Sequence, residues 1–329
     1  MSAADLPVPV NVDAADDPPR VVDAHHHLWD LGTGRYPWLQ GPRQSPDDLS
    51  GIGPFQRTYR VGDLLAAAAG VPLIASVHVE AAWDADSPTQ ETRWLQSVAG
   101  DTGFPQAIVA AAHLEDPHAA RILDEHLASE NVRGVRQMLD WDPRPGAAQP
   151  PKLLSDPDWV AGLALLAPRN LSFDLQVLPN QLGAAARVVR RYPDTVFILD
   201  HGGYHMARDP AAECTWRAGI QLLAACPNVC VKTSGYDAVD RSWAPAGFRM
   251  FIRTLVEAFG PDRTMFASNF PIDARGIHFP QLVALCRWAL DDLTKEERDA
   301  FFAATAAQIY RLTLPSGSPV QPHRRAGSE

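Results

Sequence analysis

Eight short apolar runs alternate with longer amphipathic stretches along this chain, and that alternation restricts the folds open to it. Most of the runs lack a polar–apolar alternation, as expected of strands that are buried on both faces. The predicted strands are Arg20–Ala24, Leu73–Val79, Ala107–Ala112, Val132–Arg136, Leu171–Val177, Thr195–Leu199, Asn228–Lys232 and Thr264–Ala267. Helical periodicity predicts helices at Thr89–Val98, Pro117–Ser129, Asp156–Leu166, Gln181–Tyr192, Pro210–Ala225, Ala244–Phe259, Phe279–Leu290 and Lys295–Leu312. Eight strands and eight helices fit an α/β fold, a distorted (β/α)8 TIM barrel.

An open, doubly wound sheet is the alternative fold. It loses support because no GxGxxG follows the first strand and no GxxxxGK[ST] occurs in the chain. Composition does not change near the middle, so we expect one barrel domain over residues 20–313, with flexible arms at 1–19 and 314–329. The segment Asp30–Arg60 has little periodicity and is predicted to be a long loop that covers a site.

The charge balance argues against a nucleic-acid partner. The chain carries 29 Lys+Arg against 39 Asp+Glu, a formal net charge of −10, and no run of basic residues is longer than a pair such as Arg324–Arg325. No window has the roughly 18 uninterrupted apolar residues that span a bilayer. The four cysteines lack CxxC spacing, and the first twenty residues lack a signal-peptide pattern. We therefore expect a cytoplasmic protein with free thiols and no membrane partner.

Polar residues stand at the ends of all eight predicted strands, where a barrel enzyme places its chemistry. The first strand ends in three histidines. Side chains alternate along a strand, so His25 and His27 are expected to point into the barrel mouth together and His26 toward the helices. Asp23 has the parity of His25 and is expected to orient its ring by accepting the second ring N–H. Two imidazoles on one face predict a shared ligand.

Two cationic residues at other strand ends predict the charge of the substrate. Arg136 suits bidentate capture of a carboxylate, and Lys232 suits stabilisation of an oxyanion, so a small anionic molecule is the expected substrate. Glu80 is either a site carboxylate or the ion-pair partner of Arg136, and His78 shares its strand parity. Trp83 is a candidate for the pocket wall.

The order of several motifs resembles the amidohydrolase-related family, in particular its branch of sugar-acid lactonases and pyrone dicarboxylate lactonase. The likeness extends from Val21 to Leu312. The resemblance implies a distorted barrel that hydrolyses a cyclic ester and, in metal-dependent members, a divalent ion, often zinc, on the first-strand His pair. The motifs are VVDAHHHLWD from Val21, VHVEAAWD from Val77, ETRWLQ from Glu91, GVRQ from Gly134, FDLQVLPNQ from Phe173, LDHGG from Leu199 and ASNFPID from Ala267.

Two positions depart from the pattern that the resemblance implies. His25, His27 and His201 match family histidines, and together they are the candidate metal ligands. Gln176 stands where many metal-binding members have His, and it is assigned to substrate binding. Asn269 stands where the catalytic family usually has Asp, and a carboxamide cannot take a proton from water.

The chemistry at the barrel mouth therefore has more than one interpretation. His201 is the first candidate for the general base and His27 the second, while Asp273 is a possible substitute for the missing carboxylate. Asp200 is expected to alternate away from His201 as a structural residue, and His205 and His118 are expected at the surface.

A lactone hydrolase is the leading prediction, with a carboxylated or polyhydroxylated substrate and either zinc or no cofactor. The alternatives are a non-hydrolytic enzyme of the same fold, such as a decarboxylase, C–C lyase or ring-rearranging enzyme, and an inactive ligand-binding barrel. A homodimer is a further expectation.

Overall fold

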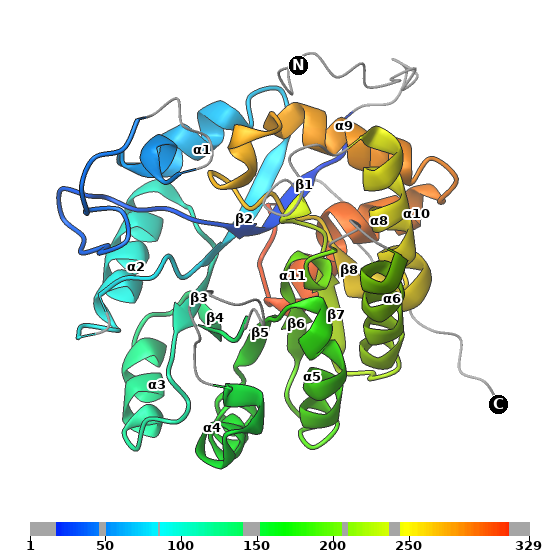
Figure 1. Ribbon diagram of the computed structural model, residues 1–329. Coiled ribbons are helices and arrows are strands. Elements are labelled where there is room, and N and C mark those ends of the chain that lie inside the picture. The colour runs from blue at the N-terminus through cyan, green and yellow to red at the C-terminus, as the bar shows by residue number, and fades with distance from the viewer. Residues whose placement is uncertain are drawn as a thin grey trace.

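The computed structural model describes residues 18–45, 51–84, 86–140, 152–205, 210–236 and 244–315. Eight parallel strands run in chain order around a barrel, with helices outside it (Figure 1), which confirms the predicted fold. The strands are β1 (Val21–His26), β2 (Leu73–Val79), β3 (Ala107–Ala111), β4 (Val132–Met138), β5 (Ser172–Gln176), β6 (Phe197–Leu199), β7 (Val229–Lys232) and β8 (Thr264–Met265). Most of the predicted flexible arms and part of the predicted long loop lie outside the described residues.

The last strand is short, and backbone hydrogen bonds from the chain that follows it close the barrel. The Ala24 N–H donates to the Phe266 carbonyl at 3.1 Å, and the Asn269 N–H donates to the His25 carbonyl at 2.7 Å. Phe270 forms a parallel bridge with His26. The segment after β8 therefore lies directly against the strand that carries the histidines.

Apolar side chains fill both faces of the strands, as the unalternating runs predict. One cluster packs under the surrounding helices, and a second includes Val22, Ala75, Val109 and Ile198. Tyr310, near the end of the described residues, joins this second cluster with no exposed surface. Polar side chains inside the strands, such as Asp23, Ser76 and Asp174, are therefore fully buried.

Most helices lie where periodicity predicts them. The helices are α1 (Val61–Ala67), α2 (Gln90–Thr102), α3 (Ala119–Leu127), α4 (Pro157–Gly162), α5 (Leu182–Val189), α6 (Pro210–Ala224), α8 (Pro245–Phe259), α9 (Phe279–Ala289), α10 (Lys295–Asp299) and α11 (Thr305–Ile309). None of those described is both long enough and apolar enough to cross a membrane. The sequence analysis missed α1, although Asp63 caps its first turn by accepting the Arg60 N–H at 2.8 Å.

Two predicted helices are interrupted in the structure. Asp156 caps α4 by accepting the N–H groups of Asp158 and Trp159, but the helix ends at Gly162 and continues only as short 3₁₀ turns. The stretch Lys295–Leu312 contains a π-helical turn between α10 and α11. In that turn the Phe301 carbonyl accepts a bond from the Phe266 N–H at 2.9 Å, which diverts it from the helix and ties the C-terminal segment to the barrel.

Gly162 lets α4 pack directly on the chain after β3, because a β-carbon at this position would lie 2.1 Å from the Leu114 carbonyl oxygen. We expect Gly162→Ala to lower the free energy of unfolding by about 1–3 kcal/mol through overpacking. Gly183→Ala in α5 is the matched control, since its nearest neighbour would be Leu222 Cδ1 at 4.0 Å. Urea unfolding of both variants checks this, and equal effects of the two substitutions would contradict the packing argument.

Candidate active site

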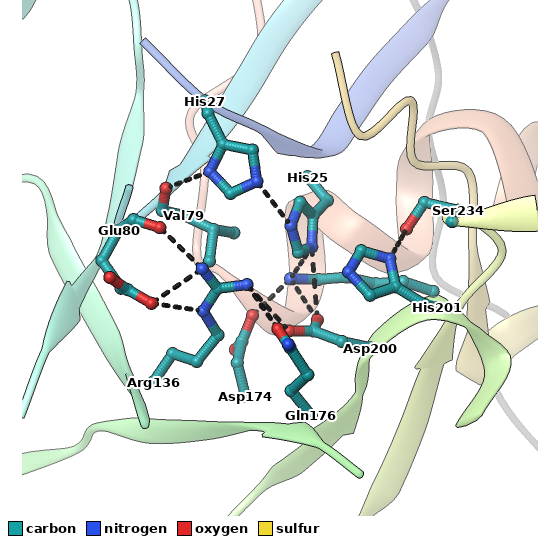
Figure 2. A network of polar contacts seen from close by, with 12 residues as sticks. His25, His27, Val79, Glu80, Arg136, Asp174, Gln176, Asp200, His201 and Ser234 are labelled. Atoms are coloured by element: carbon teal, nitrogen blue, oxygen red, sulfur yellow. Dashed lines mark hydrogen bonds and ion pairs between the residues drawn. The ribbon is translucent and has the colours of Figure 1, made fainter. Parts of the chain in front are cut away.

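His25 and His27 point toward each other at the end of β1 (Figure 2), with their Nε2 atoms 3.3 Å apart. His27 Nδ1 lies 2.8 Å from the Val79 carbonyl oxygen. A carbonyl only accepts, so His27 donates from Nδ1, and in the neutral ring Nε2 is left as an acceptor. His26 lies on the other side of the strand, with Nε2 2.9 Å from Ser76 Oγ. The predicted separation of His26 from the pair is confirmed.

Asp23 does not orient the His25 ring, and that expectation is wrong. Its carboxylate accepts hydrogen bonds from the backbone N–H and hydroxyl of Ser268, at 2.8 and 2.6 Å, and from the His25 N–H at 3.2 Å. The register between β1 and β2 shifts after Asp23, so strict alternation does not continue from Asp23 to His25. Asp23 instead fastens the chain after β8 to β1.

The ring of His25 is held from below by a buried cluster of charges. Lys232 Nζ forms an ion pair with Asp174, lies 3.1 Å from Asp200 Oδ1 and lies 3.4 Å from His25 Nδ1. Asp200 Oδ1 is 3.3 Å from His25 Nδ1, and the Tyr310 hydroxyl donates to Asp174 Oδ2 at 3.2 Å. All five residues are fully buried. The carboxylates therefore match the charge of Lys232 before any substrate enters.

The position of Asp200 is a correction, because the sequence analysis placed it outside the site. β6 ends at Leu199, and the chain then turns with His201 and Gly202 both at φ 55°, which breaks the alternation on which that expectation depended. Burial alone would raise the pKa of Asp200, but Lys232 and His25 hold it well below its usual value. Asp200 is therefore an ionised group that pairs with Lys232 beside the His25 ring.

His201 lies beside His25, with ring centroids 4.6 Å apart. Its Nδ1 is 2.9 Å from Ser234 Oγ at the end of β7. Burial lowers the pKa of His201 to about 4, so the ring is neutral at pH 7. Gly235 closes over this imidazole, where a β-carbon would lie 2.6 Å from His201 Cβ, and its φ of 76° also favours glycine.

Arg136 is bound by protein groups on three sides. Its Nε donates to Glu80 Oε1 at 2.7 Å, Nη2 donates to the Glu80 carbonyl at 2.7 Å, and Nη1 donates to Gln176 Oε1 at 2.9 Å. Of the two expectations for Glu80, the structure shows the ion pair. Since its partner is a buried carboxylate, Arg136 does not present an uncompensated charge to a substrate carboxylate.

Asn269 and Asp273 form a hydrogen-bonded pair beside β1. Asn269 has a φ of 55°, and its Nδ2 donates to Asp273 Oδ1 at 3.0 Å. Asp273 Oδ2 accepts the Gly235 N–H at 2.8 Å. Asp273 thus connects the Asn269 side chain to the backbone that covers His201.

Two residues from the β2 end, Trp83 and His78, are held by neighbours from the loop layer and from the chain directly after β1. Trp83 packs edge-to-face on Tyr36, with ring centroids 5.0 Å apart, and covers Gly34 in the loop layer. His78 Nδ1 accepts the Leu28 N–H at 3.1 Å, whereas the Glu80 carboxylate pairs with Arg136.

His205 is not a surface residue, which corrects the expectation from sequence. It is 4% exposed, forms an ion pair with Glu213 of α6 and packs on Trp216, with ring centroids 4.4 Å apart. His118 is exposed as expected.

The two Nε2 atoms of His25 and His27 have the spacing of neighbouring ligands on a tetrahedral zinc, about 3.3–3.4 Å for Zn–N bonds of 2.0–2.1 Å. Within the described part of the chain, however, no group of three His, Cys, Asp or Glu side chains is arranged to hold a metal. The carbonyl oxygen of Gln176, its only ligating atom, is already bound by Arg136. The described side chains therefore provide a pair of nitrogen donors rather than the three-ligand site of a catalytic zinc.

Curated relatives cover almost the whole chain. An uncharacterized protein, y4mH, of Sinorhizobium fredii is 35% identical over 294 residues, which are 89% of this chain and 98% of the relative. An L-fucono-1,5-lactonase of Burkholderia multivorans is 29% identical over 308 residues, 90% of this chain and 97% of the relative. The L-fucono-1,5-lactonase of Burkholderia ambifaria is also 29% identical.

Solved structures show the same barrel. An amidohydrolase of Burkholderia multivorans with bound HEPES has a TM-score of 0.75 at 26% identity, over 89% of this chain and all of that one. A second crystal form with bound zinc has a TM-score of 0.73. The amidohydrolase family model matches residues 22–312. This chain therefore belongs to the amidohydrolase family, as its motifs indicated.

Proposed function

We propose that this protein hydrolyses a small lactone at the carboxyl ends of its strands. The observation that carries the proposal is the cluster of buried imidazoles of His25, His27 and His201, each held by a neighbour from another strand end. A neutral imidazole keeps an unprotonated ring nitrogen that can accept a proton from water and return it. The L-fucono-1,5-lactonases among the relatives support a cyclic ester as substrate.

His201 is the proposed general base. With its Nδ1 proton donated to Ser234 Oγ, the ring offers Nε2 to a water molecule. The water oxygen forms a bond to the lactone carbonyl carbon as Nε2 takes a water proton, and the carbonyl π electrons move to oxygen. When the ring C–O bond breaks, the same proton passes from His201 to the departing ring oxygen. The product is a hydroxy acid.

The proposed substrate is an uncharged, polyhydroxylated lactone rather than the anion expected from the sequence. Lys232 is enclosed by Asp174 and Asp200, and Arg136 is paired with Glu80. A substrate carboxylate would have to compete with these pairs, whereas hydroxyl groups can donate to neutral acceptors such as His27 Nε2. The sugar lactone in the names of two relatives is of this uncharged kind.

No step of this scheme passes through a metal, since the described donors do not complete a three-ligand site. Zinc in the Burkholderia multivorans neighbour belongs to that protein. In our proposal, His25 and His27 position substrate oxygens, and Lys232 and Asp200 support the His25 ring from beneath.

We expect the protein to hydrolyse L-fucono-1,5-lactone or a related aldono-1,5-lactone, with kcat/KM at least about tenfold above that for 2-pyrone-4,6-dicarboxylate, because desolvating unpaired carboxylates costs about 1–3 kcal/mol.

Since the base must be neutral, kcat/KM should be flat above about pH 5 and fall as the pH drops through the His201 pKa of about 4. His201→Asn should lower kcat by about 10²–10⁴-fold. A pH-indicator assay with this panel measures both, and no turnover of any lactone would contradict the proposal.

Metal removal should leave the activity unchanged. We expect protein purified without added metal to contain well below one zinc per chain by mass spectrometry, and its kcat to be the same before and after dialysis against a chelator. A kcat that falls on chelation and returns with zinc would contradict this metal-independent scheme.

A further inference from the structure

The two carboxamides of the site are each oriented by a charged neighbour. Gln176 lies beside the Arg136 guanidinium, which has donors only, so the atom 2.9 Å from Nη1 must be the carbonyl oxygen. Its Nε2 then faces the opposite way, with one long contact of 3.4 Å to Asp140 Oδ1. An amide nitrogen carries two hydrogens. Gln176 therefore has a second N–H available to a ligand.

Asn269 is oriented with the reverse polarity. Its neighbour is the Asp273 carboxylate, which accepts a bond from the Gly235 N–H through its other oxygen. The Asn269 atom 3.0 Å from Asp273 is therefore the nitrogen. The Asn269 backbone N–H is fixed on the His25 carbonyl, which holds this side chain next to the histidines. Asn269 accordingly presents an acceptor, Oδ1, where Gln176 presents a donor.

We propose that Gln176 Nε2 donates to the lactone carbonyl oxygen and that Asn269 Oδ1 accepts a hydrogen bond from the attacking water. This inference rests on the proposed function and adds which atom of each reactant each amide binds. Arg136 and Asp273 are then positioning residues, because each fixes which end of its amide faces the substrate.

The polarity of the reactants matches this assignment. A lactone carbonyl oxygen has lone pairs and no hydrogen, so it binds a donor, and its charge grows as the water adds. Gln176 is 6% exposed, and a donor in such a shielded place stabilises the developing charge more than it would in water. The attacking water has two hydrogens. One passes to His201, and the other is held by Asn269 Oδ1, which directs the oxygen lone pair toward the carbonyl carbon.

The donor role is tested by binding, independently of turnover. The probes are L-fucono-1,5-lactam, which keeps the ring carbonyl and resists hydrolysis, and 1,5-anhydro-L-fucitol, which lacks the carbonyl. By calorimetry, wild-type protein should bind the lactam about five- to tenfold more tightly, as expected for one hydrogen bond of about 1 kcal/mol. Gln176→Met removes the donor at similar volume and should abolish this preference. The matched control is Gln308→Met in α11, which exchanges an exposed carboxamide and should leave the preference intact.

Three results overturn the donor role: binding of neither probe, equal binding of both by the wild type, or an unchanged preference in Gln176→Met. Failure of the proposed function looks different, because the lactam would still be preferred through Gln176 while no lactone in the panel is hydrolysed.

The acceptor role is tested by reversing the pair. Asp273→Asn replaces the acceptor that faces Asn269 with an amide, so Asn269 can rotate and present its NH2 group. We expect kcat to fall about tenfold or more while lactam affinity stays within about twofold, since the carbonyl contact is on Gln176. The double variant Asn269→Asp/Asp273→Asn restores the bond with reversed polarity and should recover kcat above the single variant. An unchanged kcat in the single variant, a matching loss of lactam affinity, or no recovery in the double variant overturns the proposal.

Discussion

The ion pairs of Lys232 with Asp174 and Asp200 are the interaction on which the rest of the site depends. A fully buried ammonium is tolerated only with carboxylate partners, so these three strand ends must converge. With Lys232 fixed there, its Nζ lies 3.4 Å and the Asp200 oxygen 3.3 Å from His25 Nδ1, so the cluster holds that ring. The Tyr310 hydroxyl, from the far end of the chain, donates to the same charge cluster. The same buried contacts therefore hold the barrel strands together and position the His25 ring.

This arrangement changes the role of the two cations at the barrel mouth, Arg136 and Lys232. Two cations in an acidic protein suggested electrostatic attraction of an anion, but each is matched by a buried carboxylate within 2.7–3.1 Å. An ion pair held in this way has little charge left to attract a distant ligand, and it is costly to break. Arg136 and Lys232 instead hold Gln176 and His25 in position. Their function is geometric, and the groups that face a ligand are neutral imidazoles and amides.

The sequence was sufficient to predict the barrel, because eight buried strands in series permit few other folds. It also identified His25 and His27, whose alternation relative to His26 needs only a regular strand end. Predictions from strand alternation were wrong at the positions where the backbone is irregular. The register shift after Asp23 removed that carboxylate from His25, and the left-handed turn at His201 brought Asp200 into the site. Alternation detects neither shift, because it assumes a regular strand.

A carboxamide differs from a carboxylate or an imidazole in having two ends of opposite polarity and similar shape, so its chemistry depends on the neighbour that fixes it. Sequence alone therefore does not show which end of Gln176 or Asn269 faces a ligand. The neighbours decide the orientation. The Arg136 guanidinium has donors only and binds the carbonyl oxygen of Gln176, whereas the Asp273 carboxylate binds the amide nitrogen of Asn269. Because these neighbours carry opposite charges, the two amides must present opposite ends. A reaction that adds a proton-bearing nucleophile to a proton-free carbonyl requires that same difference.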